Sequence, residues 1–186
     1  MIGHNNGPTM EAGFAFRRHA WGKARKELLP RLPIEVIRNR VRRAEEIGLD
    51  YKTYATVRAA TGRDIVAFLF STNALRLFRA EQAMEAARRD KLAGLRGIRR
   101  QALAVGAIDP ERLLRLHGEV LDRVAKAPPI HASWSQAAEA MDAARGGKLP
   151  ADAILLIGDT AIEREWSQAG RLAGYIEADR FFTNPG

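Results

Sequence analysis

The sequence predicts an all-α protein, a multi-helix bundle with a helical hairpin in its N-terminal half. Three observations support this prediction. Apolar residues recur at helical spacing along much of the 186-residue chain. Capping residues and prolines stand where helices would begin, and glycines stand where they would end. No two segments read as a convincing pair of strands, and a single short strand cannot satisfy its own backbone.

The N-terminal segment is expected to hold an arm and one helix. Residues 1–12 are polar and contain glycine, asparagine and proline, so a disordered arm is expected there. Apolar residues in 13–29 recur at helical spacing among basic ones, which predicts an amphipathic helix. Pro30 would end that helix, because proline disfavours helical geometry in the residue before it.

The next two helices are predicted to form a hairpin over 34–63. The first spans 34–47, and Gly48 is suited to the left-handed conformation that often ends a helix. Asp50 can cap the second, which spans 51–60. A short turn at Gly48 would therefore join the two helices.

The middle of the chain is harder to assign. The run Ile-Val-Ala-Phe-Leu-Phe at 65–70 suits a buried strand or a buried helix, which look alike over this length. We predict a helix, because no convincing partner strand is at hand. A long helix is expected over 73–104, with a possible break at Gly94 or Gly97. Paired strands at both 65–70 and 153–157 would overturn the all-α prediction.

The C-terminal part shows clearer helix signals. Residues 109–111, Asp-Pro-Glu, combine a cap, a first-turn proline and an acidic first turn, and predict a helix as far as residue 127. Ser133 can cap a further helix over 134–145. The segment 149–175 is expected to form one helix or two.

Charge divides the chain near residues 106–110. Residues 1–102 carry 21 Lys and Arg against 10 Asp and Glu, whereas residues 103–186 carry nine against 12. We therefore expect a basic helical part over 13–105 and a mildly acidic part over 106–186. The second part is expected to pack on the first and to serve a homo-oligomer contact or another protein partner.

Composition narrows the classes of function. The net charge of +8 and the pI of about 10.4 favour a polyanionic partner, although an arginine-rich composition alone would also produce them. The chain has no cysteine, which excludes disulfides and cysteine catalysis. It has no apolar run of the roughly 18–20 residues that a membrane span needs. The N-terminus lacks a signal-peptide pattern, so a cytoplasmic protein without a membrane partner is expected.

The segment 40–63 contains a recognisable pattern. Ala44 is a small residue, and Gly48 follows it by four positions. Apolar residues flank these positions: Ile47, Leu49, Tyr54 and Val57. The stretch resembles helix-turn-helix DNA-binding domains, in which a small residue lets two helices cross closely and a glycine makes the turn. Arg43 departs from that pattern, because the motif places an apolar residue there.

The resemblance implies a nucleic-acid-binding protein, with duplex DNA favoured over RNA. The helix over 51–60 would enter the major groove, where its first residues would contact base edges or phosphates. The candidate nucleic-acid-binding residues are Arg40, Arg42, Arg43, Tyr51, Lys52, Thr53, Thr56, Arg58 and Arg63. The alternative is a plain helical hairpin in which Tyr51 and Tyr54 pack into the core.

No catalytic residues, cofactor or metal site are predicted, since the four histidines lack metal-binding spacing. Two rival functions stay open. The first is a helical adaptor or assembly protein whose arginines pair with acidic protein surfaces. The second is an enzyme that uses Asp159 and the polar segment 71–73. Residues 158–160, Gly-Asp-Thr, could hold a metal or phosphate at a strand end, but a helix break with Asp159 or Thr160 as its cap is expected.

Aromatic residues mark further positions of interest. Trp21, Trp134 and Trp166 are expected to anchor the core or an interface. Phe181 and Phe182 lie close to the C-terminus and are expected to dock that tail on the body of the protein.

Overall fold

The computed structural model describes residues 32–147 and 149–183. Contacts divide the chain into two compact units, Met1–Ile37 and Arg38–Gly186. The sheet and its covering helices belong to the second unit. The predicted arm over 1–12 and the predicted helix over 13–29 lie outside the described residues.

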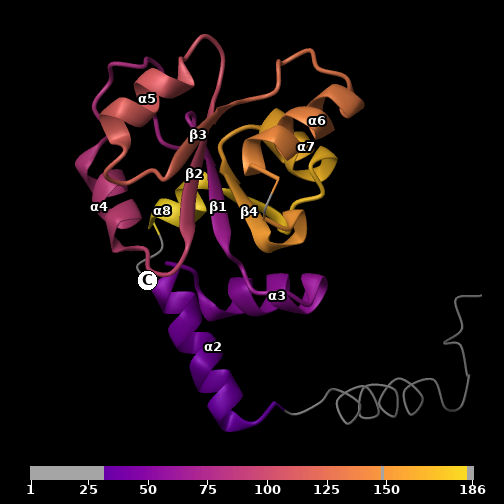
Figure 1. Cartoon of the computed structure of the whole chain (residues 1–186). Coiled ribbons are helices and arrows are strands. Elements are labelled where there is room, and N and C mark those ends of the chain that lie inside the picture. The colour runs from indigo at the N-terminus through magenta and orange to yellow at the C-terminus, as the bar shows by residue number, and fades with distance from the viewer. Residues whose placement is uncertain (1–31, 148, 184–186) are drawn as a thin grey trace, which may run out of the picture. The chain divides into compact units, whose positions relative to one another are not determined.

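The second unit is built around one parallel sheet (Figure 1). Its five strands are arranged in the order β3-β2-β1-β4-β5, and every neighbouring pair is parallel. They are β1 (Ala67–Ser71), β2 (Arg99–Ala104), β3 (Arg123–Lys126), β4 (Ile154–Gly158) and β5 (Gly174–Glu177). The protein is therefore α/β, and the prediction of an all-α bundle is wrong.

Helices precede, connect and follow these strands. They are α2 (Ile34–Glu46), α3 (Tyr51–Thr61), α4 (Ala86–Gly94), α5 (Pro110–His117), α6 (Trp134–Arg145), the 3₁₀ turn η1 (Ala151–Ala153), α7 (Ala161–Ala169) and α8 (Ala178–Thr183). Strands β1 and β2 are joined through α4, and β2 and β3 through α5. The chain then crosses the sheet through α6 to β4, beside β1, and reaches β5 through α7.

The segment 65–70 shows why the fold prediction failed. Its residues 67–70 belong to β1, whose five residues are all buried. Phe68 and Phe70 belong to one apolar cluster, whereas Ala67 and Leu69 belong to the other. A parallel strand covered on both faces has a continuous apolar sequence, which on its own cannot be told from a buried helix. Its pairing partners β2 and β4 begin 32 and 87 residues after it, as the bounds of the three strands show.

The long predicted helices are corrected in the same way. The predicted helix over 73–104 is replaced by a loop, by α4 and by β2. The predicted helix from 109 to 127 ends at His117, and β3 occupies its last part. The segment 149–175 holds η1, β4, α7 and the start of β5. In each case a strand lies within a segment whose short apolar runs also fit a helix, and only pairing with a distant strand decides between them.

Two apolar layers hold the sheet. On one face, residues of α4, α5 and α8 pack together with the α2–α3 hairpin, through Leu92, Leu113, Phe181 and Tyr54. On the other face, α6 and α7 cover the sheet through residues such as Met141 and Trp166. Helices on both faces and a reversal of strand order between β1 and β4 make this a doubly wound sheet.

The local helix signals are confirmed. Asp50 accepts a hydrogen bond from the backbone N–H of Thr53 at 2.8 Å, and Gly48 has a φ of +68°. Asp109 caps α5 with Pro110 in its first turn, and Ser133 caps α6. These signals depend on neighbours in the sequence, so they hold in either fold class.

The aromatic residues have separate outcomes. Phe181 is buried, and its ring centroid lies 5.3 Å from that of Phe68, so the predicted docking of the tail is confirmed. Trp166 is a core residue, whereas Trp134 is 60% exposed and does not anchor the core. Trp21 lies outside the described residues.

Candidate functional site

The α2–α3 hairpin has the burial pattern expected of its apolar residues. Ala44, Ile47, Leu49 and Tyr54 are buried. A side chain at Gly48 would meet Leu95 Cδ2 at 2.9 Å in addition to the strain of its positive φ. The hairpin is therefore held against the sheet by the same residues that a helix-turn-helix core would use. Membership of that class of DNA-binding domain stays a prediction.

Arg43 ties the hairpin to the rest of the fold. Its Nε lies 3.1 Å from Asp64 Oδ2, and its Nη2 donates to the carbonyl oxygens of Ile65 and Gly97, each at 3.0 Å. Its side chain is 19% exposed. Arg43, which departs from the helix-turn-helix pattern, thus connects the hairpin to the segments around Asp64 and Gly97.

Two more candidate arginines are neutralised within the fold. Arg58 Nη1 lies 3.6 Å from Asp64 Oδ1 and donates to the Tyr54 hydroxyl at 3.4 Å. Arg63 Nε lies 2.9 Å from Asp152 Oδ2. A nucleic acid would have to compete with these carboxylates, so neither arginine offers an unpaired charge.

The start of α3 is partly occupied. The Thr53 hydroxyl donates to Asp50 at 2.6 Å and accepts from Arg180 at 2.6 Å. Hydrogen bonding from Thr53 lowers the pKa of Asp50, which keeps this cap ionised. Tyr51 is half-buried, whereas Lys52 is exposed. Thr56 is exposed, and its hydroxyl donates to the carbonyl oxygen of Lys52.

Arginines gather where the strands begin. Parallel strands place all their amino ends at one edge of the sheet. Arg99 is the first residue of β2, and Arg96 lies three residues before it and donates its N–H to the carbonyl oxygen of Glu46 in α2 at 2.8 Å. Together with Arg40 and Arg42 of α2 they form what we call the amino-edge basic surface. Within the described ranges, none of these four has a carboxylate oxygen within 4.0 Å.

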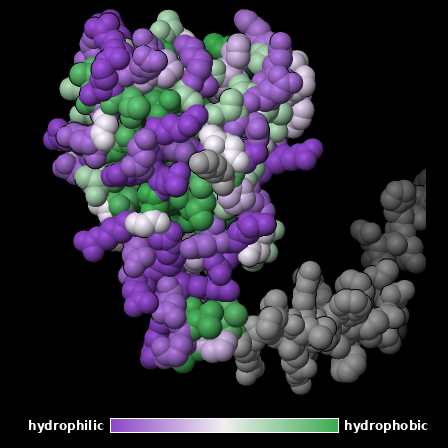
Figure 2. Space-filling view, in the orientation of Figure 1, coloured by the Kyte–Doolittle hydropathy of each residue, from purple (hydrophilic) through white to green (hydrophobic). Residues whose placement is uncertain are grey.

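The sequence could not single out Arg96 and Arg99. Both fall inside the predicted helix over 73–104, where arginines are expected on helix faces rather than at the end of a strand. Hydrophilic residues dominate the region of α2 in the space-filling view (Figure 2). Among the predicted residues, Arg40 and Arg42 are without a carboxylate partner in the described ranges, whereas Arg43 is engaged by Asp64, Ile65 and Gly97.

The opposite, carboxyl edge brings together the two segments of the enzyme alternative. Asn73 follows β1 and Asp159 follows β4, at the point where the strand order reverses. Ligands of doubly wound proteins bind at such a point. Gly158 ends β4 and Asp159 follows it, as the metal or phosphate interpretation required, and Thr160 caps α7, as the helix-break interpretation required.

The buried carboxylate of Glu163 links the loops that follow β1 and β4. It is fully buried, and it accepts hydrogen bonds from Asn73 Nδ2 at 2.8 Å and from the Asp159 N–H at 2.6 Å. Asp159 Oδ2 in turn lies 2.8 Å from Arg76 Nη1. Burial, followed by the charge of Glu163, raises the pKa of Tyr175 to about 12. These polar groups hydrogen-bond or pair with one another, and they hold the loops of the carboxyl edge in position.

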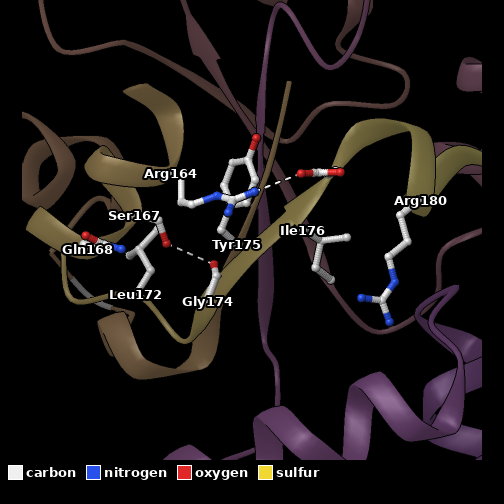
Figure 3. Close-up of a pocket in the computed structure, with 9 residues that line it drawn as sticks. Arg164, Ser167, Gln168, Leu172, Gly174, Tyr175, Ile176 and Arg180 are labelled. Carbon is white, nitrogen blue, oxygen red and sulfur yellow. Dashed lines mark hydrogen bonds and ion pairs between the residues drawn. The ribbon is translucent and has the colours of Figure 1, made fainter. Parts of the chain in front are cut away.

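A pocket of about 500 Å³ lies beside β5 and α7 (Figure 3). Its charged groups also have partners: Arg164 pairs with Glu177 at 2.8 Å and stacks over Tyr175. Ser167 donates to the carbonyl oxygen of Gly174. This pocket therefore offers few free polar groups to a ligand.

In the part of the chain that the structure describes, no three or more His, Cys, Asp and Glu residues are grouped as a metal site would require. None of the helices found there is both long enough and apolar enough to cross a membrane. No protein-family model, curated protein or solved structure matches the chain significantly.

Proposed function

We propose that the protein binds nucleic acid, duplex DNA foremost, through the amino-edge basic surface and the α2–α3 hairpin. One observation carries the proposal: Arg40 and Arg42 of α2 and Arg96 and Arg99 beside the start of β2 have no carboxylate oxygen within 4.0 Å among the described residues, and the Arg96 N–H donates to the end of α2 at Glu46. Unneutralised arginines close together raise the local potential, and a phosphate backbone supplies the opposite charge.

The hairpin would contribute through the solvent-facing side of α3. Lys52, Thr56, Ala59 and Ala60 are exposed and recur at helical spacing. The small alanines would allow close approach to a groove, while Lys52 and Thr56 would contact phosphates or base edges. Because the Thr53 hydroxyl is engaged by Asp50 and Arg180, Lys52 is the residue of the first turn of α3 that would mainly contact nucleic acid.

Salt dependence tests the electrostatic part. Fluorescence anisotropy would follow binding to duplex DNA, single-stranded DNA and RNA while the salt concentration rises. Each neutralised phosphate contributes about −0.9 to the slope of log K against log salt for duplex DNA. The Arg96→Ala, Arg99→Ala double variant should therefore flatten the slope by roughly two and weaken binding at low salt.

A second double variant tests whether the effect depends on where the two arginines lie or only on the loss of two positive charges. Arg89 and Arg115 are surface arginines that lie within 4.0 Å of Asp90 and Glu111, respectively. The Arg89→Ala, Arg115→Ala double variant removes the same charge and should leave the slope nearly unchanged. Equal losses in both double variants would contradict a localised surface. Absence of binding to all three nucleic acids at low salt would refute the proposal, and a preference for single strands or RNA would refute its duplex part.

The hairpin is tested by Lys52→Ala. This exposed substitution should weaken DNA binding and leave the melting temperature nearly unchanged. Arg58→Ala serves as its counterpart, because Arg58 contacts Asp64 and the Tyr54 hydroxyl and should affect stability more than binding. Unchanged affinity in Lys52→Ala would mean that α3 is part of a plain hairpin.

A cytoplasmic location belongs to the same proposal, because a nucleic-acid partner is available there. Fractionation of cells that produce the full chain, with nuclease treatment of one half of the sample, would test it. Recovery with a membrane or secreted fraction would contradict this part.

Self-assembly through residues 106–186 is a second candidate function, favoured by exposed apolar side chains at the start of α6. Ile130 is 63% exposed and Trp134 is 60% exposed, and Trp134 lines a pocket of about 630 Å³. Large aromatic residues are enriched at protein interfaces. Sedimentation velocity should then show a homo-oligomer that Trp134→Ala dissociates, and a monomer at all concentrations would contradict this candidate.

A further inference from the structure

A pocket of about 520 Å³ opens at the carboxyl ends of β1 and β2. Its walls come from the loop that follows β1 and from the loop that joins β2 to α5, and include Phe78, Arg79, Gly106 and Arg112. The volume falls in the range of roughly 300–1,000 Å³ that small-ligand sites occupy. The carboxyl edge of a doubly wound sheet is also where such ligands bind.

Phe78 is the unusual member of this wall, because its side chain is 61% exposed. The loop that carries it is nevertheless fixed. The Phe78 N–H donates to Gln82 Oε1 at 3.0 Å, and Gln82 Nε2 donates to the carbonyl oxygen of Arg76 at 2.7 Å. The buried His117 holds the carbonyl oxygen of Gln82 at 3.1 Å from its Nε2. An aromatic ring is thus presented to solvent on an ordered loop, which is how a stacking platform is built.

Two arginines and two carboxylates line the pocket, and Lys126 behind its wall adds one positive charge. Arg112 pairs with Glu81 at 2.7 Å, and one oxygen of Asp109 accepts backbone hydrogen bonds at the start of α5. Arg79 and Lys126 have no carboxylate oxygen within 4.0 Å in the described segments.

Lys126 is held against the pocket wall. Its Nζ donates to the carbonyl oxygens of Gly106 at 2.5 Å and of Ile108 at 3.1 Å, and both residues line the pocket. Gly106 leaves open space where a side chain would stand. A planar group could therefore approach the backbone there, with cations close by.

We infer that this pocket binds a nucleotide, with the base stacked on Phe78 and the phosphate attracted by Arg79, which lines the pocket. Aromatic stacking and a cation beside it recognise the same unit whether it is a free mononucleotide or one residue of a single strand. The inference goes beyond the proposed function, because it concerns the opposite edge of the sheet and none of the amino-edge arginines takes part.

Isothermal titration calorimetry of the full chain tests this inference with AMP, GMP, CMP and UMP, with adenosine, and with a single-stranded oligothymidylate. Phe78→Ala should weaken binding of the nucleotides about tenfold, the usual effect of losing one stacked aromatic side chain. Phe78→Trp should preserve binding, and its fluorescence should be quenched by the bound base. Arg79→Ala should weaken AMP and leave adenosine unchanged, because only AMP carries the phosphate.

Leu116→Ala and Arg115→Ala are the matched controls, since each removes an exposed side chain of the same kind from α5. Saturable binding of mononucleotides identifies a free nucleotide as the ligand, and binding of the oligothymidylate alone identifies a single strand. Absence of saturable binding to every probe at millimolar concentration overturns the inference. Binding that survives both Phe78→Ala and Arg79→Ala also overturns it. Loss of duplex binding in the amino-edge variants, by contrast, would leave these titrations unchanged.

Discussion

At the carboxyl edge of the sheet the buried Glu163 is surrounded by donors, and Asp159 pairs with Arg76. At the amino edge, Arg96 and Arg99 have no carboxylate partner among the described residues. Both edges are rich in charge, yet the charges around Glu163 hold the loops after β1 and β4 in place, whereas Arg96 and Arg99 remain available to a partner. A count of charges along the chain cannot show this difference, because it depends on which side chains face each other.

The hairpin at the amino edge gives the largest expected loss of stability. Tyr54 is 1% exposed and donates its hydroxyl to Asp64 at 2.7 Å. Tyr54→Ala should lower the free energy of unfolding by about 3–5 kcal/mol, the cost of emptying a buried aromatic site. Urea denaturation would measure this, with Tyr54→Phe as the control that loses only the hydroxyl. A loss below about 1 kcal/mol would show that the hairpin does not pack on the sheet as described.

The carboxyl edge should respond nearly as strongly to the loss of Glu163. Glu163→Ala leaves the Asn73 amide and the Asp159 and Thr160 N–H groups without their acceptor. Unsatisfied buried donors of this kind should lower the free energy of unfolding by about 3 kcal/mol. Duplex DNA affinity of the folded protein should not change, since the amino edge is intact. An equal fall in DNA affinity would break the separation between the two edges.

The contacts of Arg43 at the amino edge should contribute less to the free energy of unfolding than Tyr54 or Glu163. Arg43→Ala removes donors to the carbonyl oxygens of Ile65 and Gly97, and should cost about 2 kcal/mol in unfolding free energy. Arg42, whose one described contact is with Asn39, is its neighbour in sequence and the natural control. Arg42→Ala should change stability by less than about 0.5 kcal/mol. Equal losses of stability in Arg43→Ala and Arg42→Ala would show that the contacts of Arg43 do not stabilise the fold.

The smallest expected effect is a change with pH at the carboxyl edge. The pKa of Tyr175 rises from 10.0 to about 12 on folding, mainly through burial. The folded state therefore holds this proton more tightly, so the contribution to stability is complete below pH 10 and falls as pH rises towards 12. Tyr175→Phe should lose less stability than the wild type across that interval, as measured by urea denaturation at a series of pH values. Parallel plots of unfolding free energy against pH for the wild type and Tyr175→Phe would show that ionisation of Tyr175 does not contribute to the pH dependence of stability.

The pairing of strands explains why the fold class could not be predicted. The caps Asp50, Asp109 and Ser133 act within three residues, and all three begin helices as expected. Strand β1 instead depends on β2 and β4, whose sequences lie far along the chain and also fit helices. Periodicity over five or six apolar residues does not separate the two structures, so the error in one strand propagated to its partners.

The candidate site shows the same division between sequence and tertiary structure. The sequence by itself determined the basic balance of the N-terminal half and the hairpin with its turn at Gly48 and its buried Tyr54. Only the tertiary structure decided that Arg43, Arg58 and Arg63 pair with internal carboxylates, whereas Arg96 and Arg99 meet none among the described residues. Helix caps and turns are fixed by neighbours along the chain, whereas charge neutralisation and strand pairing are fixed by groups that meet only when distant segments pack together.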